Sequence, residues 1–241
     1  MSKVLITGAT SGIGEALVHK YLKQGNEVIA CGRNRIKLIR LLEQTNSELL
    51  TTLSFDITKI DEIEKALSTI EQLDIIILNA GDCEYIDDAS RFDNKLFQHI
   101  INVNLISIGH LLHFLLPKMS GGSQVVLISS SVTALPLPRA EAYGASKAGL
   151  DYLANSIRID LSKHNIGVTL VHPGFVETPL TDKNTFYMPF KIKSTDAAKR
   201  IYDGVSAKKN YLHFPKRFTY LLKLTGLLPT SVWQKLVARS I

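Results

Sequence analysis

A tyrosine and a lysine stand four residues apart in the segment Tyr-Gly-Ala-Ser-Lys, residues 143–147. On a helix, residues at this spacing share one face, so their side chains are neighbours. An unperturbed tyrosine ionises near pH ~10, too high for useful proton transfer at neutral pH, and a nearby ammonium group lowers that pKa. Tyr143 and Lys147 are therefore a candidate acid–base pair. The spacing alone is common on amphipathic helices, so other residues must support this interpretation.

Three glycines, Gly8, Gly12 and Gly14, follow a β-branched run at residues 3–7 and precede an expected helix at 15–24. Such a strand, turn and helix is typical of a phosphate cradle. The missing side chains let the backbone approach a pyrophosphate, and the helix N-terminus offers free N–H groups. The alternative is a tight turn that binds nothing, but the position directly after an N-terminal strand favours a nucleotide cofactor.

The expected second strand, residues 27–31, ends in Cys-Gly-Arg-Asn-Arg without a carboxylate. In dinucleotide folds an acidic residue near this point holds the ribose 2′-hydroxyl, whereas an arginine accommodates a 2′-phosphate. Arg33 offers several donors to a phosphate. The sequence therefore predicts NADP(H) rather than NAD(H), with a solvated Arg33 of no special role as the alternative.

Strands and helices alternate along the chain. Further strands are expected at 51–55, 74–78, 124–128 and 167–171, and helices at 36–47, 60–72, 92–118 (bent near Gly109) and 142–164. This alternation predicts an α/β fold, a Rossmann-like doubly wound parallel sheet in a single domain, residues 1–241. Ligands of such sheets bind beyond the carboxyl ends of the strands. The residues at or just beyond those ends are Gly8, Arg33, Asp56, Asn79, Ser130 and Pro173.

With these residues in place, the chain resembles the short-chain dehydrogenase/reductase family over residues 3–178. The motifs that carry the resemblance occur in the family's order and spacing: Thr-Gly-x-x-x-Gly-x-Gly at 7–14, Asn-Ala-Gly at 79–81, Asn104, a serine thirteen residues before the tyrosine, Tyr143/Lys147, and Pro173-Gly174. The thirteen-residue spacing selects Ser130 over Ser129 and Ser131. Each motif alone is weak, but the ordered set is specific.

The resemblance implies a role for each matched residue. Tyr143 would act as general acid in carbonyl reduction, Lys147 would lower its pKa and bind the nicotinamide ribose, and Ser130 would hydrogen-bond the substrate oxygen. Asn104 would hold a water that links Lys147 to solvent. Cofactor contacts are expected from Gly8, Ser11, Gly12, Ile13, Gly14, Arg33, Asp56, Ile57, Asn79, Ala80, Gly81, Tyr143, Lys147, Pro173, Gly174, Val176 and Thr178.

The composition fits a globular protein. The chain has 241 residues, 45% hydrophobic and 21% charged, with a net charge of +6. Two cysteines, Cys31 and Cys83, predict no disulfide framework, and the seven histidines suggest no metal-ligand set. No signal peptide and no stretch apolar enough to span a bilayer is recognised. These observations predict a cytoplasmic location and no bound metal.

Two segments near the C-terminus bear on the substrate. By resemblance, residues 178–194 form a substrate lid, and its cluster Phe-Tyr-Met-Pro-Phe at 186–190 suggests an apolar pocket or, alternatively, a cover for the protein's own core. Residues 208–241 form a basic, apolar tail with a strand at 211–214 and two short helices broken at Pro229. Three roles stay open for this tail: contact with a membrane surface, a flap over the substrate site, or a subunit contact.

The predicted function is an NADPH-dependent oxidoreductase that transfers a hydride between nicotinamide and the carbonyl or alcohol of an apolar small molecule or acyl chain. The alternative is a non-catalytic NADP(H)-binding regulator on the same fold. A nucleic-acid partner is suggested only by charge, and the sequence has no recognised motif for one. Members of this family usually form dimers or tetramers through two long helices, which correspond here to residues 92–118 and 142–164. The resemblance therefore predicts a homodimer or homotetramer.

Overall fold

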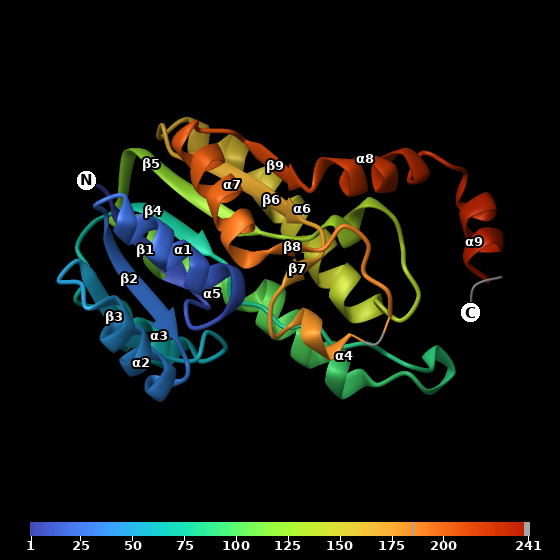
Figure 1. The fold of residues 1–241 in the computed structure, drawn as a ribbon, viewed down its shortest axis with the longest axis horizontal. Coiled ribbons are helices and arrows are strands. Elements are labelled where there is room, and N and C mark those ends of the chain that lie inside the picture. The colour runs from blue at the N-terminus through green and yellow to red at the C-terminus, as the bar shows by residue number, and fades with distance from the viewer. Residues whose placement is uncertain (185, 239–241) are drawn as a thin grey trace.

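The computed structural model describes residues 1–184 and 186–238, and it is built around one seven-stranded parallel sheet (Figure 1). The strand order is β3-β2-β1-β4-β5-β6-β9, and every neighbouring pair is parallel. This is the predicted doubly wound sheet. The strands are β1 (Lys3–Thr7), β2 (Glu27–Gly32), β3 (Leu50–Ser54), β4 (Leu73–Leu78), β5 (Met119–Ile128), β6 (Gly167–Pro173) and β9 (Tyr211–Phe214), with β7 (Val176–Glu177) and β8 (Ile192–Lys193) forming a separate pair.

Helices cover both faces of the sheet. One layer contains α1 (Gly12–Lys23), α2 (Arg35–Thr45) and α7 (Ser194–Ser206), and the other contains α3 (Ile60–Leu67), α5 (Ser107–Leu115) and α6 (Glu141–Ser162). A hydrophobic core lies on each face of the sheet, and alternate residues of β1 point into one or the other. Val4 and Ile6 pack with the first helix layer, and Leu5 packs with the second. All three are fully buried, which explains why the middle of β1 is apolar on both faces of the sheet.

The carboxyl ends of the central strands meet along one edge of the sheet. The strand order reverses between β1 and β4: β2 and β3 extend the sheet from β1 to one side, and β4, β5, β6 and β9 extend it to the other. A crevice outside the strand ends at such a reversal is where ligands of open α/β sheets bind. The glycine turn after β1 and the Asn-Ala-Gly segment after β4 both lie at this point.

The long helix expected at 92–118 is not continuous, and its irregularity is not at Gly109. Asp93 caps α4 (Asn94–Ile101) by accepting a hydrogen bond from Leu96 N at 2.9 Å. A π-helical turn, Asn102–Ile106, then separates α4 from α5, and a 3₁₀ turn, Leu116–Lys118, follows. Gly109 lies inside α5. The insertion therefore falls on the segment that carries Asn104, as π turns often do at functional positions.

This helical region also corrects the expectation about membrane-spanning segments. By length and composition, Asn94–Lys118 is apolar and long enough to cross a bilayer, but 44% of its most apolar window is buried inside the protein. Ile108, Leu111 and Leu115 of α5 belong to the core beneath the sheet. Packing in the fold therefore accounts for the buried part of this apolar segment.

The C-terminal tail forms α8 (Lys216–Thr225) and α9 (Thr230–Ala238), which extend from one end of the molecule, away from the N-terminus (Figure 1). The predicted break near Pro229 lies between them. Thr185 of the expected lid and residues 239–241 of the expected tail lie outside the described residues.

Candidate active site

The glycine turn after β1 is closed too tightly for side chains. Gly8 and Gly12 have φ angles of 65° and 57°, which favour glycine. A Cβ at Gly14 would lie 2.1 Å from the Gly8 carbonyl oxygen, and one at Gly12 would lie 2.7 Å from Thr178 Cγ2. Ser11, the N-cap of α1, makes no side-chain capping hydrogen bond. The turn thus presents bare backbone and uncapped N–H groups, which suits a phosphate.

The segment after β4 is fixed against this turn by hydrogen bonds. Thr7 Oγ1 accepts hydrogen bonds from the backbone N–H groups of Asn79 and Ala80, at 3.0 and 3.1 Å. Asn79 Nδ2 donates to the carbonyl oxygens of Thr7 and Gly8 at 3.0 and 3.3 Å. The two loops on either side of the crevice are therefore held as one unit.

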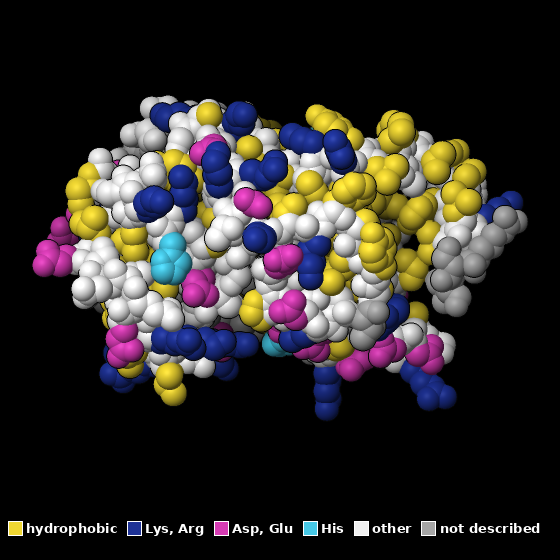
Figure 2. All heavy atoms as spheres, viewed as in Figure 1, with side chains coloured by type: hydrophobic (Ala, Val, Ile, Leu, Met, Phe, Trp, Pro, Cys, Tyr) yellow, Lys and Arg dark blue, Asp and Glu magenta, His cyan; other side chains and the backbone are white. Residues whose placement is uncertain are grey.

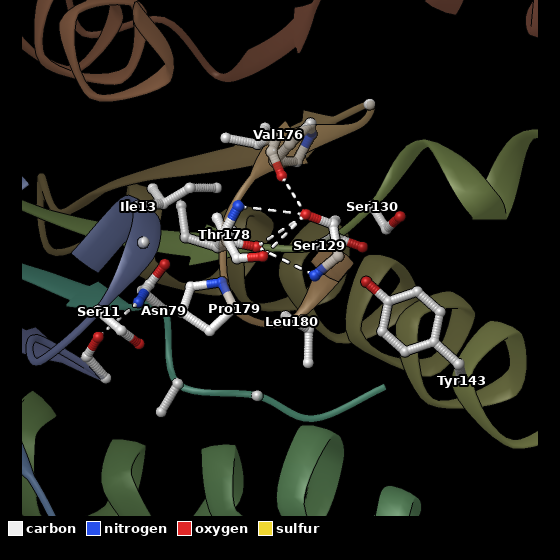
Figure 3. Close-up of a pocket in the computed structure, with 18 residues that line it drawn as sticks. Ser11, Ile13, Asn79, Ser129, Ser130, Tyr143, Val176, Thr178, Pro179 and Leu180 are labelled. Atoms are coloured by element: carbon white, nitrogen blue, oxygen red, sulfur yellow. Dashed lines mark hydrogen bonds between the residues drawn. The ribbon is translucent and has the colours of Figure 1, made fainter. Parts of the chain in front are cut away.

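A cavity follows this crevice, and we call it the cradle cavity (Figure 3). Labelled side chains in the figure come from the glycine turn and the start of α1, from the segments after β4, β5 and β6, and from α6. The predicted cofactor contacts that line it are Gly8, Ser11, Gly12, Ile13, Asn79, Ala80, Gly81, Tyr143, Pro173, Gly174, Val176 and Thr178. Ile128, Ser129, Ser130, Pro179, Leu180 and Thr181 complete the wall.

Five predicted contacts are not part of this wall: Gly14 of the glycine turn, Lys147 of α6, and three residues that follow β2 or β3, namely Arg33, Asp56 and Ile57. Arg33 is exposed just after β2, and its charge acts on Asp56, which follows β3. Although partial burial opposes the shift, hydrogen bonds from Thr58 and the charges of Arg33 and Lys59 lower the pKa of Asp56. Ile57 packs partly against the core. Arg33 and Asp56 therefore form a polar edge beyond the cradle, on the side of β2 and β3.

The Ser130 and Tyr143 side chains come from different elements and lie near each other at one end of the cradle cavity (Figure 3). Ser130 follows β5 and caps a 3₁₀ turn, where its hydroxyl accepts from Val132 N at 3.2 Å. Its neighbour Ser129 points elsewhere and donates to Asp151 at 2.5 Å. The thirteen-residue spacing selected Ser130 over its two neighbours, and the structure places Ser130 beside the tyrosine.

Burial raises the pKa of Tyr143, the nearby Cys83 raises it further, and a hydrogen bond with Ser130 partly offsets both. This differs from the expectation that Lys147 lowers that pKa. Lys147 Nζ lies 5.8 Å from the centre of the Tyr143 ring and donates to the Ile128 carbonyl oxygen at 2.9 Å. In this structure the ammonium group is thus directed past the phenol, towards the end of β5.

The Lys147 ammonium group is buried, and removing its charge from water costs free energy. Burial lowers its pKa to about 8, while Cys83 and Asp151 act in the opposite direction. Its side chain does not line the cradle cavity but lies near Gly81, where a Cβ would be 3.6 Å from Nζ. Lys147 is therefore placed behind the tyrosine, close to the Asn-Ala-Gly segment.

Asn104 occupies the π turn and is almost completely buried. Its Oδ1 accepts from Asp82 N at 2.8 Å, and its Nδ2 donates to Asp82 O at 2.8 Å and Ser146 Oγ at 3.0 Å. The side chain therefore fastens the segment after Gly81 to α6, between the tyrosine and the lysine. Its predicted contact with a water stays a prediction.

A second cavity of about 580 Å³ opens beside the first, and we call it the apolar cavity. It shares Ser130, Tyr143, Gly174, Leu180 and Thr181 with the cradle cavity. The remaining wall comes from loops and from the tail: Cys83, Tyr85, Ser131, Val132, Leu137, Pro138, Arg139, Ala140, Phe175, Asn184, Phe186, Phe218, Leu222, Trp233, Leu236 and Val237.

The lid and the tail both contribute to this wall. Phe186 of the lid lies against Phe175, with ring centres 6.0 Å apart, and is 40% exposed, so it does not cover the core. Phe218 of α8 packs on the Pro-Gly turn, because a Cβ on Gly174 would lie 2.7 Å from its ring. Trp233 of α9 donates to the Pro136 carbonyl oxygen at 2.7 Å. Of the three roles left open for the tail, the flap is the one that these contacts support.

The structure also joins residues that the sequence did not single out. Asp151, one turn after Lys147, accepts from Ser129 at 2.5 Å and lies 2.9 Å from His172 Nε2, whose Nδ1 lies 2.9 Å from the Tyr211 hydroxyl. The i, i+4 spacing from Lys147 was the available signal for Asp151. These contacts tie β5, α6, β6 and β9 together directly behind the site.

A second unpredicted group lies in and near the segment that follows Gly81. Asp82, Glu84 and His99 place their ligand atoms within 4.8 Å of one another, a grouping not expected from the spacing of the histidines. His99 Nε2 is 3.3 Å from Asp82, and Lys183 is 4.0 Å from the same carboxylate. The Asp82 carboxylate is thus already flanked by basic groups.

Comparison with known proteins agrees with this geometry. The family described as "short chain dehydrogenase" matches residues 2–187. A serine 3-dehydrogenase from Agrobacterium fabrum is 32% identical over 84% of this chain and 81% of its own length. A serine dehydrogenase in complex with NADP⁺ superimposes with a TM-score of 0.80 at 24% identity, covering 88% of this chain and 94% of that one.

A 3-ketoacyl-(acyl-carrier-protein) reductase from Brucella melitensis, complexed with NADH, superimposes with a TM-score of 0.79 at 23% identity over 88% of this chain and 95% of that one. These two structural likenesses concern the fold. The family match covers most of the chain and includes every motif up to the lid. The chain therefore belongs to the short-chain dehydrogenase/reductase family of oxidoreductases.

Proposed function

We propose that this protein is an NADPH-dependent oxidoreductase that transfers a hydride between nicotinamide and the carbonyl carbon of an apolar small molecule or acyl chain. The observation that carries the proposal is the junction of the two cavities. Ser130 and Tyr143 belong to the walls of both. A cofactor in the cradle cavity and a substrate in the apolar cavity would therefore meet at these two hydroxyl groups.

The cradle fits a dinucleotide because a side chain at Gly14 would collide with the Gly8 carbonyl oxygen, and the N-terminus of α1 has no side-chain cap. When bound, the nicotinamide supplies the hydride. The N–H groups of the glycine turn would hold the pyrophosphate. Lys147, which lies near Gly81, would hold the nicotinamide ribose. The hydroxyl groups of Ser130 and Tyr143 would orient the substrate oxygen.

In the direction of reduction, the carbonyl carbon accepts the hydride and its oxygen accepts a proton from the Tyr143 hydroxyl. Ser130 donates a hydrogen bond to the same oxygen and stabilises its developing negative charge. The raised pKa of Tyr143 keeps the phenol protonated before reaction. Oxidation of an alcohol reverses these steps, with the phenolate as base.

Two observations support NADPH as the preferred cofactor. Arg33 lies exposed at the end of β2, where a 2′-phosphate would be placed. The related serine dehydrogenase structure contains NADP⁺, although the ketoacyl reductase structure contains NADH. Asp56 follows the neighbouring strand β3, and the charge of Arg33 acts on its carboxylate. We therefore expect discrimination to depend on Arg33.

An apolar substrate is favoured by the cavity wall. Phe175, Phe186, Phe218, Leu222 and Trp233 form much of its surface. Arg139, its one formally charged residue among the described lining, is paired with Asp87. A small zwitterion such as serine would find few charged partners among the described residues of this wall, whereas an apolar chain would bury its surface.

The test is a titration with NADPH and NADH, for the wild type and Arg33→Ala, followed by assays of apolar ketones and aldehydes. We expect a preference for NADPH that falls at least tenfold in Arg33→Ala, since a charge-assisted contact to phosphate is lost. Arg35→Ala, two residues further on, is the matched control. A preference for NADH in the wild type would contradict the cofactor assignment. Tight NADPH binding without turnover of any carbonyl would favour the non-catalytic regulator.

A further inference from the structure

Helix α8 of the tail carries apolar residues on two sides. Phe218 and Leu222 of α8 face the apolar cavity, one helical turn apart. On the other side, Tyr220, Leu221 and Leu224 are 58%, 56% and 67% exposed. A helix that only covered the cavity would need one apolar stripe, with polar residues opposite. The second stripe therefore requires a separate explanation.

The exposed side continues into the link to α9. Leu227 and Leu228 are 80% and 40% exposed, and Val232 is 42% exposed. Together with Tyr220, Leu221 and Leu224 we call these residues the outer tail surface. In Figure 2, hydrophobic side chains gather over the end of the molecule where α8 and α9 lie, with Lys and Arg beside them. Contiguous apolar patches of this kind mark interaction sites.

The charge of the tail has one sign. After Asp203 the sequence contains seven Lys/Arg and no Asp or Glu. Lys216, Arg217, Lys223 and Lys235 are all exposed on α8 and α9. Two copies that paired through this surface about a two-fold axis would bring like charges together. An anionic partner would instead be attracted by all four.

From these observations we propose that the outer tail surface docks on an anionic phospholipid membrane. Exposed leucines interleaved with lysine and arginine on short helices are the pattern of an interfacial helix: the apolar side chains enter the acyl boundary, and the cations pair with the headgroups. Because α8 and α9 also form part of the wall of the apolar cavity, docking would place this cavity next to the lipid surface. Docking does not depend on the proposed activity, because it needs neither cofactor nor substrate.

The proposal is tested by co-sedimentation of the full chain with vesicles of phosphatidylcholine alone and of phosphatidylcholine with phosphatidylserine at 3:1. We expect binding to the anionic vesicles, weaker binding to the neutral ones, and a loss at high salt, since surface charges are screened. Leu224→Glu/Leu227→Glu should reduce the affinity at least tenfold. Arg217→Gln/Lys235→Gln should reduce it by on the order of tenfold for anionic vesicles.

Ile36→Glu is the matched control, because Ile36 on α2 is 78% exposed, close to the value for Leu227. We expect it to leave vesicle binding unchanged. None of the substituted tail residues lines either cavity, so NADPH binding and thermal melting check that each variant is folded. The single tryptophan of the sequence, Trp233, gives a test without substitution: brominated lipids should quench its fluorescence.

Two results would overturn the proposal. One is a wild type that does not bind anionic vesicles, or binds them no better than Leu224→Glu/Leu227→Glu. The other is a dimer in analytical ultracentrifugation that this double variant dissociates, because the outer tail surface would then be a subunit contact. Equal quenching of Trp233 by brominated lipids in the wild type and in Leu224→Glu/Leu227→Glu would be the first of these results, seen by a second measurement.

Discussion

The cradle cavity and the apolar cavity meet at Tyr143, but different kinds of groups form their walls. The cradle is made largely of backbone and small residues, packed so tightly that a Cβ on Gly14 would lie 2.1 Å from a carbonyl oxygen. The apolar cavity is made of large side chains from the loop before α6, the lid, α8 and α9. One wall is fixed by turn geometry, and the other by side-chain volume.

This difference separates the two tasks of the site. A backbone cradle recognises groups that every dinucleotide carries, so its sequence requirements are strict and local. A wall of side chains can change its shape by substitution without altering the sheet. We therefore expect substitutions in the cradle to act on cofactor binding and stability, substitutions in the apolar wall to act on substrate choice, and substitutions at the junction to act on turnover.

The largest effect is expected at the junction. Tyr143→Phe removes the proposed proton donor and should lower kcat by roughly 10²–10⁴-fold, the usual contribution of general acid–base catalysis. NADPH affinity should change little. Tyr152→Phe is the control, since Tyr152 is on the same helix and is 81% exposed. Steady-state assays beside cofactor titrations would check this, and a variant that turns over like the wild type would disprove the role.

A second prediction concerns the lysine behind the junction. Burial holds the pKa of Lys147 at about 8, below the usual value of 10.5. Between these two pH values the unfolded chain binds more protons than the folded protein, so the energetic cost of the buried charge is complete below pH 8 and fades as pH rises. The difference in unfolding free energy between Lys147→Met and the wild type should therefore shrink by on the order of 3 kcal/mol from pH 8 to pH 10.5.

Denaturant unfolding at several pH values measures this difference directly. A gap that stays constant or widens with pH would mean that the buried ammonium group is not destabilising. The same variant should lose turnover, which would show that the site retains a costly charge for function.

In the cradle, Gly14→Ala should cost about 1–3 kcal/mol of stability through overpacking and reduce NADPH affinity at least tenfold. Gly109→Ala is the control: it lies inside α5, and none of the described residues would come within 4 Å of its Cβ. That change should stabilise the protein by roughly 0.5–1 kcal/mol. Thermal melts and titrations of both variants test whether the cradle depends on close backbone approach.

The smallest effect is expected in the apolar wall. Leu222→Ala enlarges the cavity and should raise KM for a bulky apolar ketone by about tenfold, because lost apolar contact weakens substrate binding. Leu221→Ala, one residue away and 56% exposed, should leave KM unchanged. Equal effects of the two substitutions would show that α8 does not contact the substrate.

The sheet, the cradle and the junction could be predicted from the sequence because their signals are local. Glycine spacing, strand ends and the Tyr143–Lys147 spacing each depend on residues close together in the chain. The family resemblance then selected Ser130 from three adjacent serines, and the structure places it beside Tyr143.

The apolar wall could not be predicted in the same way, because Tyr85, Phe186 and Trp233 come together only through tertiary packing. The contact of Asp151 with His172 likewise joins α6 to β6. The π turn at Asn104 was missed because its sequence is as regular as that of an α-helix, and the glycine at 109 was a misleading signal for the irregularity. The direction of the Lys147 ammonium group, past the phenol, also depends on the position of the Ile128 carbonyl oxygen.

The most direct test of the proposed function is the transfer of deuterium from 4-deuterated NADPH to an apolar ketone, followed by mass spectrometry of the alcohol. If the two cavities meet at Tyr143 as proposed, the wild type should place one deuterium on the carbinol carbon, and Tyr143→Phe should yield almost none. The protein is used as the full chain with both stereoisomers of the labelled cofactor. Bound NADPH without deuterium transfer to any carbonyl in a broad series would contradict the account and leave a cofactor-binding protein without this chemistry.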